Sequence, residues 1–179
     1  MMKAPERRAA LIGVASILAL TCTFALAEAP ASQPPAKPAA AAAAAPAAAG
    51  EQPAHVVVQH ILIGFEGSVP GKNITRTKEE ARAVAAEVLA KAKKGDDFDA
   101  LVKQYTDDRA PGIYAMANTD VAIAPLKPGT KASGKEFPRG GMVKSFGDVA
   151  FSLTVGEIGM AEYDHANSRF GWHIIKRLE

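Results

Sequence analysis

The stretch HVVVQHILIGF, at residues 55–65, is dense in β-branched residues and predicts a buried strand. An ionisable ring, His60, lies in the middle of this apolar run. A second strand signal with its own histidine, His173, closes the sequence in FGWHIIKRLE at residues 170–179. The first and the last predicted strand therefore each carry one histidine.

After the first predicted strand, the sequence predicts two helices. Thr77 and Glu80 form a capping box, and small or aliphatic residues recur at helical spacing after it: Ala81, Val84, Ala85, Val88, Leu89 and Ala92. Basic residues and Gly95 are typical of a helix end. A shorter helix is predicted in DDFDALVKQYTDD at residues 96–108, with the apolar positions Phe98, Leu101, Val102 and Tyr105.

The remainder is predicted as a short strand at 112–117, a long surface segment at 118–139, a helix within 140–153 and a strand at 158–163. The expected order is β-α-α-β-α-β-β. Met142, Phe146, Val149 and Ala150 share one face of the third predicted helix. A shared apolar face of this kind is typical of ordinary helix core.

The first 54 residues have a different composition. Lys3, Arg7 and Arg8 precede an uncharged run that ends in Ala25-Leu26-Ala27, which predicts a signal peptide over residues 1–27. The alternatives are an uncleaved membrane anchor and a lipoprotein attached through Cys22. Residues 28–54 are Ala/Pro-rich without large apolar side chains, and predict a disordered linker. Residues 55–179 are then one domain.

Charge and cysteine content narrow the function classes. Three of the 21 Lys and Arg residues and one of the 19 Asp and Glu residues precede Ala27, so 18 of each remain after cleavage. This balance gives no electrostatic footprint for nucleic acid. Cys22 is the only cysteine, so a mature chain beginning after Ala27 has no disulfide and no thiol nucleophile. A P-loop and HExxH zinc spacing are also missing, although a metal between His60 and His173 stays open at this stage.

Four separated motifs occur in order in the predicted domain: VQHILI, ARAVAAEVLAKAKKGDDFDALVKQYTDD, GGMVKSFGDVAFSLTVGEIG and SRFGWHIIKRLE. Together they resemble the parvulin (rotamase) family of peptidyl-prolyl cis/trans isomerases. The resemblance implies an α+β, FKBP-like fold with a four-stranded, mainly antiparallel sheet and three to four helices. It implies no cofactor and no metal.

The resemblance also implies site residues. His60 and His173 match the paired histidines of the family, and Asp108 matches its Cys or Asp position, with Asp107 as the alternative. Ser168 matches a hydroxyl position in the histidine network. The resemblance implies a substrate pocket made by Met142, Phe146, Tyr114 and Phe170. For the histidine pair we expect a scaffolding and tuning role rather than direct proton transfer.

One segment departs from the family pattern. Residues 111–142 replace the family's shorter GGDLG.F segment, so they form a lid, an extra contact surface or a tolerated surface loop. The expected function is isomerisation of X–Pro bonds in proline-containing segments of unfolded or exported proteins, by a monomer located in the periplasm or secreted. The alternative is a parvulin-fold chaperone or peptide-binding module with little catalytic activity.

Overall fold

The computed structural model describes residues 52–132 and 134–179. The predicted signal peptide and residues 28–51 of the predicted linker lie outside the described residues. In chain order the elements are β1 (His55–Ile63), α1 (Lys78–Lys94), α2 (Phe98–Tyr105), β2 (Ile113–Ala117), β3 (Glu136–Pro138), the 3₁₀ helix η1 (Arg139–Gly141), α3 (Lys144–Ser152), β4 (Ile158–Ala161) and β5 (Trp172–Arg177). No helix in the described part of the chain is both long and apolar enough to span a membrane.

One mixed sheet organises the domain, with strand order β3-β2-β1-β5-β4. Strand β1 is central and pairs antiparallel with β2 on one side and with β5 on the other. The expectation of four strands was wrong, because Glu136–Pro138 adds a fifth strand that runs parallel to β2. This strand has three residues, includes a proline, and lies at the sheet edge, where a missing N–H is tolerated.

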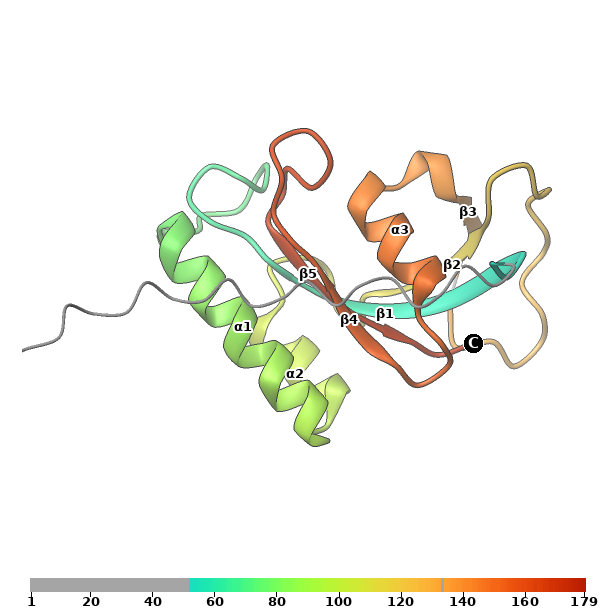
Figure 1. Ribbon diagram of the computed structural model, residues 1–179, viewed down its shortest axis with the longest axis horizontal. Helices are drawn as coiled ribbons and strands as arrows, with labels where there is room; N and C mark the ends of the chain where they lie inside the picture. Colours follow the sequence, from blue (N-terminus) through green and yellow to red (C-terminus); the bar gives the residue numbers. More distant parts are fainter. Residues whose placement is uncertain (1–51, 133) are drawn as a thin grey trace, which may run out of the picture. The chain divides into compact units, whose positions relative to one another are not determined.

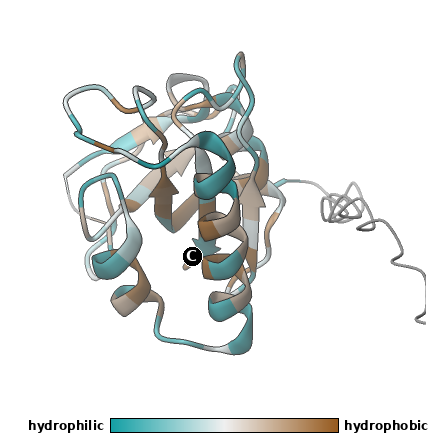
Figure 2. Cartoon of the chain, turned by 90° about the vertical axis from the view of Figure 1, so that its left-hand side faces the viewer, coloured by the Kyte–Doolittle hydropathy of each residue, from teal (hydrophilic) through white to brown (hydrophobic). Residues whose placement is uncertain are grey.

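The alternating side chains of β1 contact two separate apolar layers. Ile61 and Ile63 pack against α1 and α2, whereas Val56 and Val58 pack against α3. Figure 1 shows α1 and α2 on one face of the sheet and α3 on the other. Both faces of β1 are therefore covered, which explains its continuous apolar sequence. In Figure 2 the strands are largely brown, while the outer turns of the helices are teal.

The two N-terminal helices form as predicted. Thr77 accepts a hydrogen bond from the Glu80 amide and Glu80 reaches back to the Thr77 amide, so the capping box is complete. Gly95 ends α1 in the left-handed conformation with φ of 101°. Asp97 caps α2 by accepting from the Ala100 amide. The buried residues of α1 and α2 belong to the predicted stripes: Ala81, Ala85, Val88, Ala92, Phe98, Leu101 and Val102.

The third helix begins later than predicted. Residues 139–141 form the 3₁₀ helix η1, and α3 starts at Lys144, so Met142 lies between two helices rather than on the face of one. Two glycines at 140 and 141 favour this break, because glycine lowers helix stability. Phe146 and Ala150 of α3 still point into the same apolar layer as Val58 of β1.

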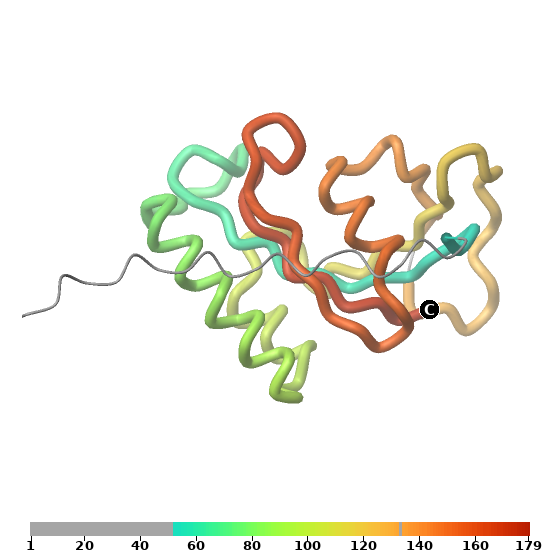
Figure 3. Tube along the Cα trace, viewed as in Figure 1, coloured from blue at the N-terminus to red at the C-terminus, as the bar shows by residue number. Residues whose placement is uncertain are grey.

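Two loops meet at the end of the sheet beside the histidines. The connection after β1 and the connection before β5 run side by side in Figure 3. The Ser68 hydroxyl donates a hydrogen bond of 2.9 Å to the Phe170 carbonyl and accepts one of 2.8 Å from the Phe65 amide. These bonds fix both loops at the mouth of the pocket described next.

Candidate functional site

The paired strands β1 and β5 bring the two predicted histidines together. Leu62 lies opposite His173 in the antiparallel register, and His60 lies opposite Ile175. His60 and His173 therefore occupy the same face of adjacent strands, and their Nδ1 atoms are 3.3 Å apart. The rings stack with centroids 5.5 Å apart, and each residue is only 4% exposed.

Asp108 completes this cluster from the segment that follows α2. Its Oδ2 atom accepts hydrogen bonds of 3.0 Å from His60 Nε2 and of 3.0 Å from the Tyr114 hydroxyl. Thr106 holds the segment in place, because its hydroxyl oxygen accepts from the amides of Leu62 and Asp108. The carboxylate is thus held by side chains of β1 and β2, and Thr106 links its backbone to β1.

The carboxylate sets the tautomers of both rings. His60 Nε2 carries the proton because a carboxylate only accepts hydrogen bonds. In neutral His60 the Nδ1 atom is then an acceptor, and it accepts a hydrogen bond from the Nδ1–H of His173. His173 Nε2 is left as a bare acceptor, in agreement with its having no hydrogen-bond partner among the described residues. This arrangement leaves no buried N–H unsatisfied, which would cost more than an unpaired acceptor.

The charge states follow from these contacts. The hydrogen bond from His60 outweighs burial and holds the pKa of Asp108 well below its usual range, so Asp108 is ionised. Burial, followed by the proximity of His60, lowers the pKa of His173 to about 3, so this ring is neutral. Burial and the Asp108 charge raise the pKa of Tyr114 to about 12, which keeps its hydroxyl proton in place.

An apolar pocket of about 220 Å³ opens beside this cluster. His60, Asp108, Tyr114 and His173 form its polar part. Its other walls come from β1, from the two loops and from the start of α3: Leu62, Val69, Met142, Val143, Phe146 and Phe170. The pocket therefore combines a mainly apolar lining with one polar cluster.

Phe146 joins the pocket to the histidines. Its ring makes edge-to-face contacts with both imidazoles, at 78° and 5.2 Å between centroids for His60 and at 65° and 5.4 Å for His173. Aromatic rings prefer such edge-to-face contacts. The polar cluster therefore also orients the aromatic wall of the pocket.

The neighbouring carboxylate has a different partner. Asp107 forms a two-pronged ion pair with Arg76, at 2.6 and 3.3 Å, and accepts from the Gly64 amide at 2.8 Å. It fastens the loop after β1 to the end of α2. Of the two alternatives from the sequence, Asp108 is the carboxylate that contacts His60.

The structure does not bring Ser168 into the histidine network. Its hydroxyl donates to the Gly171 carbonyl at 2.9 Å and its amide to the Asp164 carbonyl, so it closes the turn before β5. Within the described residues no hydrogen bond joins Ser168 to either histidine. The expectation that Ser168 orients a ring is corrected: short-range turn bonding uses its hydroxyl instead.

Four residues of the site were not predicted. Leu62 follows His60 by two positions and therefore shares its face of β1, a signal present in the sequence. Thr106 closes α2 and could have been suspected as a capping residue. Val69 and Val143 lie in connecting segments, where no periodicity marks their side chains. Within 52–132 and 134–179, no group of three or more His, Cys, Asp or Glu side chains has an arrangement suited to a metal ion.

Comparisons of the sequence with known proteins identify a family and several relatives. Residues 47–179 match the model of a family described as the PPIC-type PPIASE domain. Foldase protein PrsA 4 of Bacillus cereus is 37% identical over 95 residues, which cover 51% of this chain and 26% of the relative. Foldase protein PrsA of Geobacillus kaustophilus is 35% identical with the same coverage.

A third relative has a different name. Chaperone SurA of Chromohalobacter salexigens is 30% identical over 119 residues, covering 66% of this chain and 21% of the relative. The chain thus spans about a quarter of the length of these relatives. The family model itself covers most of the chain, including every residue of the pocket. The chain therefore belongs to the PPIC-type, or parvulin (rotamase), peptidyl-prolyl isomerase domain family.

Proposed function

We propose that this protein catalyses cis/trans isomerisation of X–Pro bonds in proline-containing segments of unfolded, exported proteins. The observation that carries the proposal is the pocket of about 220 Å³ in which apolar walls adjoin the Asp108–His60 hydrogen bond. The foldase and chaperone names of the relatives support a role in assisting protein folding.

Catalysis needs only a preference for the twisted amide. Rotation about a peptide bond has a barrier of about 18–20 kcal/mol because the C–N bond has partial double-bond character. Phe146, Met142 and Phe170 bind the proline ring and exclude water, while the residue before proline remains free to rotate. No bond to a nucleophile and no proton transfer is required, since stronger binding of the transition state is sufficient.

Asp108 supplies the electrostatic part of this preference. The planar amide concentrates negative charge on its carbonyl oxygen, and this charge decreases when resonance is lost on twisting. A fixed carboxylate beside that oxygen disfavours the planar forms more than the twisted form. Tyr114 and His60 hold the carboxylate in place, and His173 holds His60, so the histidines are positioning residues.

We also propose the domain organisation and location of the protein. Residues 1–27 act as an export signal, residues 28–54 as a linker and residues 55–179 as the isomerase domain. The signal-like N-terminal sequence and the foldase and chaperone relatives support an exported protein, periplasmic or secreted. Attachment of a lipid at Cys22 is the alternative, and the mass of the mature N-terminus distinguishes the two. The domain acts as a monomer.

A second candidate function is peptide binding without significant catalysis. The observation that favours it is the long segment between β2 and β3, which replaces the shorter connection of the family pattern and lines a cavity of its own. A domain with this function would bind unfolded client proteins without isomerising their X–Pro bonds.

The test is acceleration of cis/trans isomerisation in X–Pro tetrapeptides by the purified protein, beside Phe146→Ala and Phe98→Ala. Both phenylalanines are buried, but Phe98 lies on the opposite sheet face. Each substitution costs about 3–5 kcal/mol of stability. We expect the activity per folded molecule to fall only in Phe146→Ala. If the folded wild type accelerates isomerisation for no residue before proline, peptide binding without catalysis would be the supported function.

A further inference from the structure

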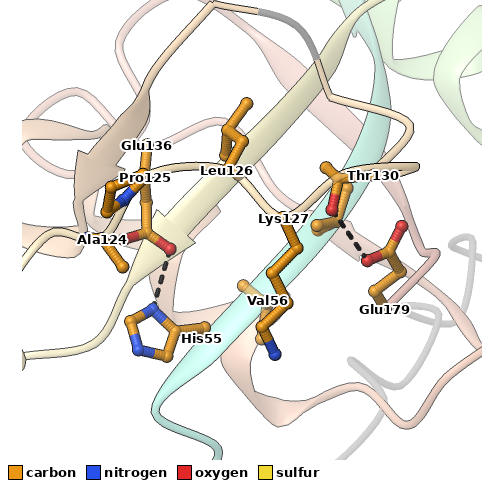
Figure 4. A pocket seen from close by; sticks show the side chains of 11 residues that line it. His55, Val56, Ala124, Pro125, Leu126, Lys127, Thr130, Glu136 and Glu179 are labelled. Carbon is orange, nitrogen blue, oxygen red and sulfur yellow. Dashed lines mark hydrogen bonds and ion pairs between the residues drawn. The ribbon is translucent and has the colours of Figure 1, made fainter.

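A second cavity lies on the sheet face opposite the histidines. Val57 of β1 and Ala115 of β2 are register partners and form its floor, and Val57 points away from the face that carries His60. Figure 4 shows the segment with Pro125, Leu126 and Lys127 crossing above these strands. We call this space of about 230 Å³ the insertion cavity; it is lined by His55, Val56, Val57, Ala115, Ala124, Pro125, Leu126, Lys127, Thr130, Glu136 and Glu179.

A buried carboxylate is the main polar group of the insertion cavity. Glu136 is 6% exposed, and its two oxygens accept hydrogen bonds of 2.8 Å from His55 Nδ1 and of 2.7 Å from the Ala124 amide. The bond from His55 joins β1 to β3, and the bond from the Ala124 amide holds the crossing segment to the sheet. Among the described residues its hydrogen-bond donors are the His55 imidazole, which forms an ion pair with it when protonated, and a backbone amide, so no Lys or Arg side chain contacts Glu136.

A second carboxylate lines the same cavity. Glu179 accepts from the Thr130 hydroxyl at 3.3 Å and from the Lys131 amide at 3.4 Å, both of which are long hydrogen bonds. Among the described residues, no Lys or Arg side chain forms an ion pair with Glu136 or Glu179, and Lys127 forms no ion pair at all. The cavity therefore combines an apolar floor with two carboxylates that lack a permanent cationic partner.

We propose that the insertion cavity is a second, non-catalytic site that binds a basic side chain of an extended client segment. A Lys or Arg side chain would place its charged end at Glu136 and its methylene groups on Val57 and Ala115. Long basic side chains suit this combination of apolar floor and charged end. A buried carboxylate without a Lys or Arg partner gains from such a ligand, because charge-assisted hydrogen bonds between two ionised groups are stronger than neutral ones. That the occupant belongs to a polypeptide rests on the proposed function.

The two sites would act on different parts of one client. The pocket beside His60 takes the proline ring, whereas the insertion cavity takes a basic residue elsewhere in the chain. Because the sites lie on opposite faces of the sheet, one segment cannot fill both with adjacent residues. Binding at the second site would hold the client while successive X–Pro bonds are presented to the first.

The test uses proline-free peptides, so that the proline pocket is not the target. The probes are acetyl-Ala-Leu-Arg-Leu-Ala-amide and its counterpart with Gln in place of Arg. Amide chemical shifts of the isotope-labelled protein are followed by NMR during titration. We expect the Arg peptide to shift signals of Val57, Ala115 and Ala124 and to leave those of His60 and Phe146 in place. The Gln peptide should bind at least about tenfold more weakly.

Three variants complete the test. Glu136→Gln should weaken the Arg peptide about tenfold or more, and the exposed control Glu79→Gln should not change it. Lys127→Gln should bind the Arg peptide more tightly, because it removes a positive charge from the cavity; this variant keeps the test valid if Glu136→Gln fails to fold. Isomerase activity should be unchanged in all three, so failure of this proposal is distinguishable from failure of the proposed function.

Several results would overturn the proposal. They are equal binding of the Arg and Gln peptides, shifts confined to His60 and Phe146, or no binding by the folded protein. Cavity signals that shift with protein concentration instead of peptide would show that a second copy occupies the cavity, and would also overturn it.

Discussion

Asp108→Asn removes the charge that organises the pocket. The Asp108 carboxylate accepts two hydrogen bonds at one oxygen, from His60 and from Tyr114, and an amide cannot reproduce both with charge assistance. Charge-assisted hydrogen bonds stabilise by about 1 kcal/mol more than neutral ones. The carboxyl is 35% exposed, so solvent screening reduces this difference. We expect Asp108→Asn to lower the free energy of unfolding by about 1–2 kcal/mol at neutral pH.

The pH dependence has a definite sign. The folded pKa of Asp108 lies below its unfolded value, so its stabilisation is complete above about pH 4 and is lost as the pH falls through the folded pKa. The Asp108 charge should therefore contribute a constant difference between the unfolding free energies of wild type and variant from about pH 5 to 8, as measured by urea denaturation. The two free energies should converge only in more acidic solution.

Tyr114 reports the same change directly. With the carboxylate removed, burial alone still raises its pKa, so the value should lie between the ordinary value of about 10 and the value of about 12 in the wild type. NMR titration of labelled tyrosine measures it, with Tyr114→Phe for assignment. The control Asp107→Asn removes a carboxylate that pairs with Arg76 and should leave the Tyr114 pKa unchanged. An unchanged Tyr114 pKa in Asp108→Asn would refute the reasoning.

Three further substitutions test other parts of the structure. His173→Leu should flatten the pH dependence of stability. The wild type loses up to about 1.4 kcal/mol of unfolding free energy per pH unit as the pH falls from 6.5 towards 3, because only the unfolded ring takes up a proton. Urea denaturation at pH 7 and 5 measures this loss, and equal losses in wild type and variant would contradict the prediction. Gly171→Ala should destabilise the protein by several kcal/mol, since the new Cβ would clash with the Ile63 carbonyl oxygen at a φ of 136°. Gly156→Ala has open space around it and should cost about 1 kcal/mol. Equal melting temperatures for the two variants would be inconsistent with this packing. Thr77→Ala should cost about 1 kcal/mol in thermal denaturation through loss of the α1 cap, and an unchanged melting temperature would argue against the capping box.

Local patterns were sufficient to predict most elements of the fold. The capping box of Thr77 and Glu80 located the start of α1, and the β-branched run around His60 identified the central strand. Strand β3 was missed because its three residues, Glu136–Pro138, carry no apolar alternation. Its pairing with β2 depends on where the preceding segment crosses the sheet, which is a property of tertiary structure rather than of local sequence.

The site could be predicted only where residues carry a chemical signal. The strand pattern located one histidine in each of two strands, whereas their pairing and the role of Asp108 came from the family resemblance. Ser168 was misassigned because a hydroxyl near a histidine in sequence can also satisfy its own turn, as it does with Gly171. Val69 and Val143 are ordinary apolar residues in connecting segments, so only the folded structure identifies them as pocket walls.

The most direct test of the central claim is exchange between the cis and trans forms of one X–Pro peptide, followed by NMR with the purified protein present. Without catalysis this exchange takes tens to hundreds of seconds. We predict exchange within the NMR timescale of about a second or less, together with shifts of the His60, Tyr114 and Phe146 signals. Shifts at these residues without faster exchange, or faster exchange without these shifts, would contradict the claim that this pocket isomerises X–Pro bonds.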